Sequence, residues 1–220
     1  MSPRVTSVVG VIAAGGSGER LGADRPKAFV VCGGRPLLEW SVDVLSEVCD
    51  EVVVAVPAGH EEDIAAPDVR VVAGGASRSD SVRRALAAAP DAAVAVVHDA
   101  ARPLVTRELV ERCLAALGGD VDGVVAAAPV SDTIHAVDAE LTVRATPPRS
   151  ELWAAQTPQV FRADVLRRAL DADAQTLAAA TDDAALVVAA GGRVRIVCAP
   201  RENIKVTTRA DLLVAESALC

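Results

Sequence analysis

The chain has 220 residues, of which 51% are hydrophobic, and this composition suits one large domain (residues 1–220) with a single extended core. Its net charge is −8 and only 2% of its residues are aromatic, with no tyrosine, so a general nucleic-acid surface is not expected. Its longest apolar runs are far shorter than the ~18 residues of a membrane span. Five scattered cysteines without a C-x-x-C pair favour a reducing compartment, so we expect a cytoplasmic protein without a membrane partner.

Short valine-rich runs alternate with longer amphipathic segments rich in alanine and leucine. This alternation is typical of an α/β fold whose mostly parallel sheet is covered by helices on both faces. We expect strands at residues 5–13, 51–56, 69–73, 93–98, 123–128 and 193–197. Helix-start residues predict helices at 37–46 after Pro36, 82–89 after Ser79, 109–117 after Thr106, 182–190 after Thr181 and 210–218 after Thr207.

The segment 131–148 breaks this rhythm. Its apolar and polar residues alternate over Thr133 to Val137, and it ends in Pro147 and Pro148. We therefore expect a protruding β-arm with little core of its own. Such an arm needs a partner surface, so the sequence predicts a homodimer in which the arms exchange contacts.

The strongest local motif follows the first predicted strand and reads AAGGSGERLG over residues 13–22, with Pro26 and Lys27 after it. Glycines let backbone amides approach a polyphosphate closely, and Arg20 and Lys27 supply positive charge. The motif lacks the full spacing of a P-loop and the third glycine of a dinucleotide-binding loop. A triphosphate site is therefore favoured, while an NAD-dependent oxidoreductase and a plain turn with solvated cations remain the alternatives.

A second group of polar residues, HDAARP over 98–103, ends the fourth predicted strand. Asp99 there is a candidate Mg²⁺ ligand that would bridge nucleotide phosphates. The alternative is an ion pair between Asp99 and Arg102 that shapes a turn. A hydrolase triad is disfavoured because no G-x-S-x-G elbow is present, and the three histidines lack zinc-ligand spacing.

A third loop, GGASRSDS over residues 74–81, follows another predicted strand and opens a helix. Small residues of this kind can read the edge of a base with backbone groups, although a plain strand-to-helix turn would have the same sequence. Arg149, Thr157 and Lys205 are unremarkable when each is taken singly.

Taken together, these motifs resemble the 2-C-methyl-D-erythritol 4-phosphate cytidylyltransferase family from the first strand to the last helix. The residues that carry the resemblance are AGGSGER at 14–20, Pro26-Lys27, Gly74-Gly75 with Arg78 and Ser81, HDAARP at 98–103, DTI at 132–134, QTPQ at 156–159 and NIK at 203–205. The resemblance implies a Rossmann-like three-layer sandwich of the nucleotide-diphospho-sugar transferase type, working as a homodimer through the arm.

The resemblance also implies roles for individual residues. CTP would be surrounded by Ala14, Gly15, Gly16, Gly75, Ala76, Ser81 and Ala100, with Arg20 and Lys27 on its phosphates. The acceptor, a sugar-alcohol phosphate, would face Asp99, Arg102, Thr133, Thr157 and Lys205, and Arg149 would reach it from the other subunit. Two positions depart from the family pattern: Ala76 replaces an acidic residue and His135 replaces a lysine.

The expected chemistry is transfer of CMP from CTP to the phosphate of 2-C-methyl-D-erythritol 4-phosphate, with release of pyrophosphate, in the non-mevalonate isoprenoid pathway. An ionised phosphate needs no general base, so Arg20, Lys27 and Mg²⁺ or another divalent cation would act by positioning and charge neutralisation. The alternatives are a ribitol-5-phosphate cytidylyltransferase and a non-catalytic nucleotide-sensing module.

Overall fold

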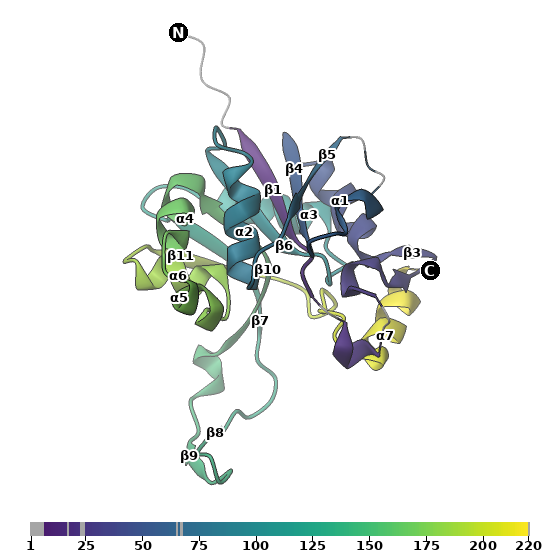
Figure 1. Ribbon diagram of the computed structural model, residues 1–220. Helices are drawn as coiled ribbons and strands as arrows, with labels where there is room; N and C mark the ends of the chain where they lie inside the picture. Colours follow the sequence, from purple (N-terminus) through teal and green to yellow (C-terminus); the bar gives the residue numbers. More distant parts are fainter. Residues whose placement is uncertain (1–6, 17, 23–24, 65, 67, 220) are drawn as a thin grey trace.

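The computed structural model describes residues 7–16, 18–22, 25–64, 66 and 68–219, and its centre is a seven-stranded sheet (Figure 1). The strand order is β11-β7-β10-β6-β1-β4-β5. The strands are β1 (Val8–Ala13), β4 (Glu51–Val56), β5 (Val69–Ala73), β6 (Val94–Asp99), β7 (Gly123–Pro129), β10 (Trp153–Arg162) and β11 (Val194–Cys198). Every pairing is parallel except the two made by β10, so the expected mostly parallel α/β sheet is confirmed.

Both faces of the sheet are buried, which makes the molecule a three-layer sandwich. Val9 and Val11 of β1 pack into one core cluster, with side chains of α2 (Arg78–Ala87), α4 (Ala163–Leu170), α5 (Ala174–Ala179) and α6 (Asp183–Ala189). Ile12 packs into the opposite cluster, with side chains of α1 (Leu37–Ser46) and α3 (Arg107–Ala116). Because neighbouring residues of a strand point to opposite faces, a continuous valine run supplies both clusters.

The ends of the helices agree with the predictions in part. Pro36 and Thr106 are the N-caps of α1 and α3, as expected. The N-cap of α2 is Ser77 instead of Ser79, because the side chain of Ser77 accepts from the amide of Asp80. The N-cap of α6 is Asp182 instead of Thr181, because the side chain of Asp182 accepts from the amide of Ala185. Residues 5 and 6 of the first predicted strand lie outside the described residues. Within the described residues, no helix combines the length and apolar character that crossing a bilayer requires.

The sequence did not predict β10, the antiparallel strand between β6 and β7. Pro158 and two glutamines stand within it, and a proline usually argues against a central strand. The structure accommodates the proline at an irregularity, because the register with β7 shifts between Ala155 and Gln159 and the Thr157–Pro158 peptide bond is cis. Two further helices in this region, α4 and α5, were also missing from the predicted elements.

The expected arm projects beyond the lower edge of the body in Figure 1 as a two-stranded ribbon of β8 (Ala136–Val137) and β9 (Val143–Ala145), followed by η4 (Arg149–Glu151). Asp138 organises its turn by accepting hydrogen bonds from the amides of Glu140 and Thr142. The carboxyl ends of β1 and β6 face the same lower edge, where η1 (Glu19–Leu21), η2 (Lys27–Phe29) and α7 (Arg209–Leu219) also lie. A small hairpin of β2 (Val31–Cys32) and β3 (Arg35–Pro36) completes the elements.

Candidate active site

The glycine loop leaves β1 at the carboxyl edge of the sheet. The amide of Ala14 donates to the carbonyl of Ala55 at 2.9 Å, which ties the start of the loop to β4. The carbonyl of Gly16 accepts from the amide of Lys27 at 2.9 Å, and a Cβ atom on Gly16 would lie only 3.3 Å from Cε of Lys27. A glycine at position 16 therefore lets the side chain of Lys27 pass directly beside the backbone.

The chain contains only two lysines, Lys27 and Lys205, and both line the same cleft with Arg20. Nζ of Lys27 donates to the carbonyl of Val206 at 3.1 Å, so the residue after Lys205 holds it in place. Burial, reinforced by the charges of Lys205 and Arg20, lowers the pKa of Lys27. Positive groups that repel one another at this site would be stabilised by a polyanionic ligand.

The third loop closes the cleft on the side of α2. The hydroxyl of Ser81 accepts from the amide of Gly75 at 3.0 Å and donates to the carbonyl of Ser77 at 2.9 Å. The carboxylate of Asp80 accepts from the amide of Ala76 at 3.1 Å, and a Cβ atom on Gly75 would fall 2.0 Å from this carboxylate. The loop conformation thus needs glycine at position 75, and side chains of α2 hold it from behind.

Asp99, the last residue of β6, is the most strongly paired carboxylate in the cleft. Its Oδ1 accepts from Nε of Arg78 at 2.8 Å and its Oδ2 accepts from Nζ of Lys205 at 2.6 Å. Burial opposes ionisation, but Arg78 and Lys205 outweigh it and hold the pKa of Asp99 well below its usual range. The alternative of an Asp99–Arg102 ion pair is wrong, because Arg102 instead donates from Nη1 to the carbonyl of Asn203 at 2.7 Å.

These contacts also bear on the expected metal ligand. Both oxygens of Asp99 already bind cationic side chains, and within the described residues no group of three or more His, Cys, Asp or Glu side chains is arranged to hold a metal ion. Mg²⁺ prefers several oxygen ligands in octahedral geometry. The metal assignment for Asp99 therefore stays a prediction, in which Mg²⁺ would be held directly or through water and would take further oxygen ligands from the nucleotide phosphates.

A buried chain of hydrogen bonds lies beneath Asp99. The amide of Asp99 donates to Oγ1 of Thr157 at 3.1 Å, and Oγ1 lies 3.0 Å from Nδ1 of His98. Nε2 of His98 lies 3.2 Å from the carbonyl of Arg102. Nε of Arg102 is itself buried without a hydrogen-bond partner, and burial lowers the pKa of this guanidinium. A buried donor without a partner is costly for the fold, so its presence here calls for an explanation.

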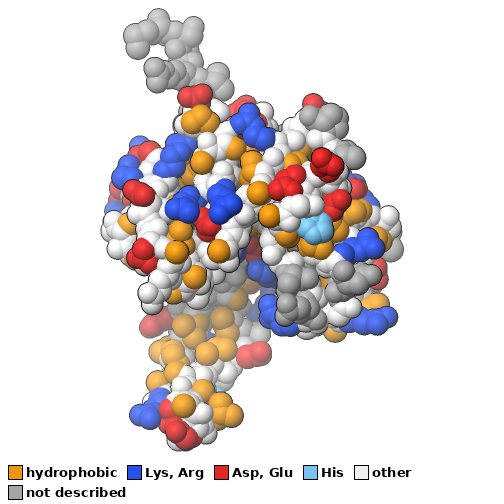
Figure 2. All heavy atoms as spheres, in the orientation of Figure 1, with side chains coloured by type: hydrophobic (Ala, Val, Ile, Leu, Met, Phe, Trp, Pro, Cys, Tyr) orange, Lys and Arg blue, Asp and Glu red, His pale blue; other side chains and the backbone are white. Residues whose placement is uncertain are grey.

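Two pockets meet at this edge of the sheet. The first has a volume of about 290 Å³ and is lined by the glycine loop, the 74–77 loop, Arg20 and Lys27. The second, of about 260 Å³, is lined by Arg102, Thr157 and the residues that precede α6. Arg78, Asp99 and Lys205 belong to both. Figure 2 shows basic side chains lining a notch in the lower edge of the body.

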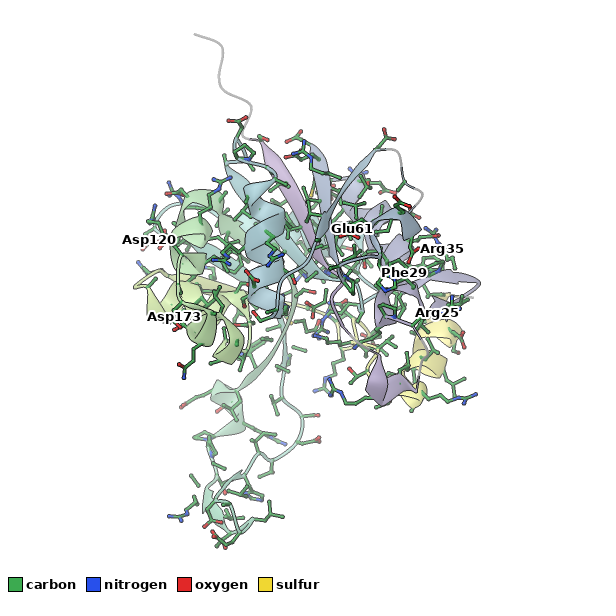
Figure 3. All side chains as sticks on the ribbon, viewed as in Figure 1. Arg25, Phe29, Arg35, Glu61, Asp120 and Asp173 are labelled. Carbon is green, nitrogen blue, oxygen red and sulfur yellow. The ribbon has the colours of Figure 1, made fainter. Side chains whose placement is uncertain are left out.

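The residues that line the two pockets come from both sides of the body. Figure 3 labels Phe29, two residues after Lys27, on the side that carries α1, and Asp173, the N-cap of α5, on the opposite side. Lys27 reaches the first pocket from the α1 side, whereas Asp182 reaches the second from the start of α6. Lys27 and Asp182, which are far apart in sequence, therefore line two pockets that meet at the carboxyl edge of the sheet.

Most of the predicted site residues lie together. The first pocket contains Ala14, Gly15, Gly16, Arg20, Lys27, Gly75, Ala76, Ser81, Asp99, Ala100 and Lys205, and the second adds Arg102 and Thr157. Thr133 and Arg149 are exposed in the arm, where Nη1 of Arg149 donates to the carbonyl of Ser131 at 3.0 Å, and they line neither pocket. The ligand contacts expected of all these residues stay predictions.

Sequence reasoning missed two charged residues of the site. Arg78 was noted as part of a motif but given no role, and Asp183 was not noted at all, although Nη1 of Arg78 donates to Asp183 at 2.6 Å. The only local signal was the Thr181-Asp182-Asp183 run at a helix start, which is commonly a capping sequence. Burial of one of those two aspartates against Arg78 depends on tertiary packing.

A mostly parallel sheet with a cationic glycine loop after β1, a second glycine loop after β5 and an adjoining pocket lined by Arg102 and Lys205 is the arrangement of a nucleotidyltransferase. The model of the family described as 2-C-methyl-D-erythritol 4-phosphate cytidylyltransferase matches residues 8–220. The chain belongs to this family, and the resemblance inferred from its motifs is confirmed.

Proteins named 2-C-methyl-D-erythritol 4-phosphate cytidylyltransferase are similar along almost their whole length. The relative from Nocardia farcinica is 47% identical, over 97% of this chain and 94% of its own. The relative from Frankia casuarinae is 46% identical, over 99% of this chain and 82% of its own. The crystal structure of the enzyme from Thermus thermophilus superimposes with a TM-score of 0.83 at 37% identity, covering 97% of this chain and 98% of that one. The expected fold class and enzyme class are thereby confirmed.

Proposed function

We propose that the chain transfers CMP from CTP to the phosphate of 2-C-methyl-D-erythritol 4-phosphate, giving 4-diphosphocytidyl-2-C-methyl-D-erythritol and pyrophosphate in the non-mevalonate isoprenoid pathway. An oxygen of the acceptor phosphate attacks the α-phosphorus of CTP, and the bond from that phosphorus to the pyrophosphate oxygen breaks. Membership of the cytidylyltransferase family supports this reaction.

The observation that carries the proposal is the junction of the two pockets. Reaction between two anions requires that both be held at one place against their mutual repulsion. Lys27 and Arg20 line only the first pocket, Arg102 lines only the second, and Lys205 lines both. This distribution suits a triphosphate in the first pocket and a monophosphate in the second, with the reacting groups meeting beside Lys205.

The residues of the chain would act by binding and electrostatic stabilisation. Lys27 and Arg20 would neutralise charge on the triphosphate, and the Gly75–Ala76 backbone would contact the base. Arg102, which lines the second pocket, would contact the acceptor phosphate. A divalent cation such as Mg²⁺ would supply further charge neutralisation on the nucleotide phosphates, with Asp99 as its candidate ligand from the protein.

The proposal extends to assembly and location. The exposed arm carries Ile134, Val137, Leu141 and Val143, whose side chains are 43%, 47%, 79% and 53% exposed. Apolar side chains on a ribbon with little core favour burial against a second copy of the chain. We propose a homodimer in which Thr133 and Arg149 enter the partner's second pocket, and a cytoplasmic location where both substrates are available.

Pyrophosphate release tests the function. The purified chain is given CTP and Mg²⁺ with 2-C-methyl-D-erythritol 4-phosphate or ribitol 5-phosphate, and UTP, ATP and NAD serve as controls. Release with CTP and methylerythritol phosphate is expected. Preference for ribitol phosphate would reassign the acceptor, and CTP binding without release from either acceptor would indicate a nucleotide-sensing module.

A further inference from the structure

Four charged side chains of alternating sign form a line across the junction of the two pockets. Asp183 of α6 accepts from Nη1 of Arg78 at 2.6 Å, and Nε of Arg78 donates to Asp99 at 2.8 Å. Asp99 in turn accepts from Lys205 at 2.6 Å. Arg78, Asp99 and Lys205 all line both pockets, whereas Asp183 lines neither.

Asp183 is the member of this line that has no contact with the pockets and no exposure to solvent. Its side chain is 0% exposed, and its Oδ1 is buried without a hydrogen-bond partner. Burial raises the pKa of Asp183, although Arg78 opposes the shift. A carboxylate in such surroundings is costly for folding, and packing alone would be served better by an apolar side chain. Its contact with Arg78 is therefore the feature that needs a functional explanation.

Arg78 is suited to join two carboxylates because its guanidinium is planar and presents donors in fixed directions. Nε and Nη1 are used on Asp99 and Asp183, and the side chain is still 26% exposed at the pockets. A lysine has a single ammonium on a flexible stem and would not hold two carboxylates in one fixed geometry. The orientation of Arg78 thus depends on the buried Asp183.

We propose that Asp183 is a positioning residue for the acceptor pocket. It anchors Arg78, Arg78 fixes the carboxylate of Asp99, and Asp99 in turn sets where the ammonium of Lys205 lies between the pockets. Asp183 begins the helix whose preceding residues, Thr181 and Asp182, line the second pocket and not the first, so Asp183 lies nearest to the acceptor pocket. This inference rests on the proposed function of the site.

The test compares the variant D183N with the wild-type chain. We expect the KM for the acceptor phosphate to rise by about tenfold, the scale of losing one charge-assisted contact, with the Kd for CTP measured calorimetrically in the absence of acceptor within about twofold. The matched control is D164N, which removes an exposed aspartate 2.9 Å from Arg168 in α4 and leaves both constants unchanged. An unchanged acceptor KM in D183N, or an equal loss of CTP affinity, would overturn the proposal.

A second set of variants asks whether Asp183 acts through Arg78. R78K keeps the positive charge but loses the double contact, and it should raise the acceptor KM as D183N does. The double variant D183N/R78K should be no worse than R78K alone, because both changes break the same line. Additive losses would count against the proposal. If circular dichroism shows that D183N does not fold, R78K alone still tests the inference. An acceptor KM in R78K equal to that of the wild-type chain would overturn it.

The two levels of inference can fail separately. If the wild-type chain binds CTP but releases no pyrophosphate with either acceptor, the proposed function fails and the acceptor KM has no meaning. If the wild-type chain is active and D183N behaves like D164N, only the positioning role fails.

Discussion

The hydroxyl of Thr157 lies 3.0 Å from Nδ1 of His98 in the core of the protein. The same hydroxyl oxygen accepts from the amide of Asp99, so the hydroxyl proton is free to be donated to Nδ1. Nε2 then carries the ring proton and donates to the carbonyl of Arg102. This pair therefore connects β10 to the end of β6, and its hydrogen bonds suit the neutral imidazole that burial favours.

The stability of the protein should fall in mild acid because of His98. Burial lowers the pKa of His98 from 6.5 to about 4 in the folded state. Below pH 6.5 the unfolded chain takes up a proton that the folded chain rejects, so the free energy of unfolding decreases between pH 6.5 and about 4. The loss should approach ~3 kcal/mol. Urea unfolding at successive pH values measures it.

The control for this prediction is H98Q, which can keep the bond to the Arg102 carbonyl but does not titrate. Its unfolding free energy should be less dependent on pH over the same window. The raised pKa of Asp183 acts in the opposite direction and is common to both proteins, so it cancels in the difference. Parallel pH profiles for the two proteins would contradict the assignment.

Lys27 should be essential for turnover. K27A and R20A each remove a positive group from the first pocket, and we expect kcat to fall by ~10²-fold or more, the scale of losing one preorganised electrostatic group. Steady-state pyrophosphate release measures the loss. R162A, which changes an exposed arginine at the far end of β10, is the control. Near-normal kcat in K27A and R20A would show that the triphosphate binds elsewhere.

Chemical labelling should locate CTP independently of activity. The lowered pKa of Lys27 leaves more of the reactive free amine at a given pH, and only Lys205 and the N-terminus compete as primary amines. Reductive methylation followed by mass spectrometry should modify Lys27, and CTP should suppress that modification. Labelling of Lys27 that is equally fast with saturating CTP would place the nucleotide outside the first pocket.

Gly75 should tolerate no side chain. A Cβ atom there would meet the Asp80 carboxylate at 2.0 Å, so G75A must displace either Asp80 or the 74–77 loop. We expect the Kd for CTP to rise by at least about tenfold, equivalent to ~1.4 kcal/mol. G118A, where a Cβ atom meets nothing within 4 Å, should bind CTP as the wild-type chain does. Equal affinities of both variants would mean that the 74–77 loop does not hold the nucleotide.

Hybrid dimers should reveal whether the arm completes the site of the other subunit. K27A and R149A are each expected to be defective. When the two variant chains are mixed, one site of the hybrid dimer combines an intact Lys27 with an intact Arg149 of the partner chain, so that dimer should regain about half of the wild-type activity. Sedimentation of the wild-type chain first tests whether it is a dimer. A mixture as inactive as its components would place Arg149 on its own subunit's site.

The sequence alone determined the alternation of strands and helices, since continuous valine runs signal strands buried on both faces. It also determined the chemistry of the loops, because glycines beside Arg20 and Lys27 suit a polyphosphate wherever the sheet places them. Local capping chemistry located Pro36 and Thr106, but several neighbouring Ser, Thr and Asp residues made the starts of α2 and α6 ambiguous.

Only the tertiary structure decided how the charges are paired. The sequence did not predict β10, because Pro158 and two glutamines are not typical of a central strand. This strand nevertheless places Thr157 beneath Asp99. The partners of Asp99 come from α2 and from the loop before α7, and Asp183 is buried only because α6 packs against the sheet. The residues of these ion pairs are 21 to 106 positions apart in the sequence. They meet because their helices, strands and loops end at the same edge of the sheet, and no local sequence pattern shows which elements do so.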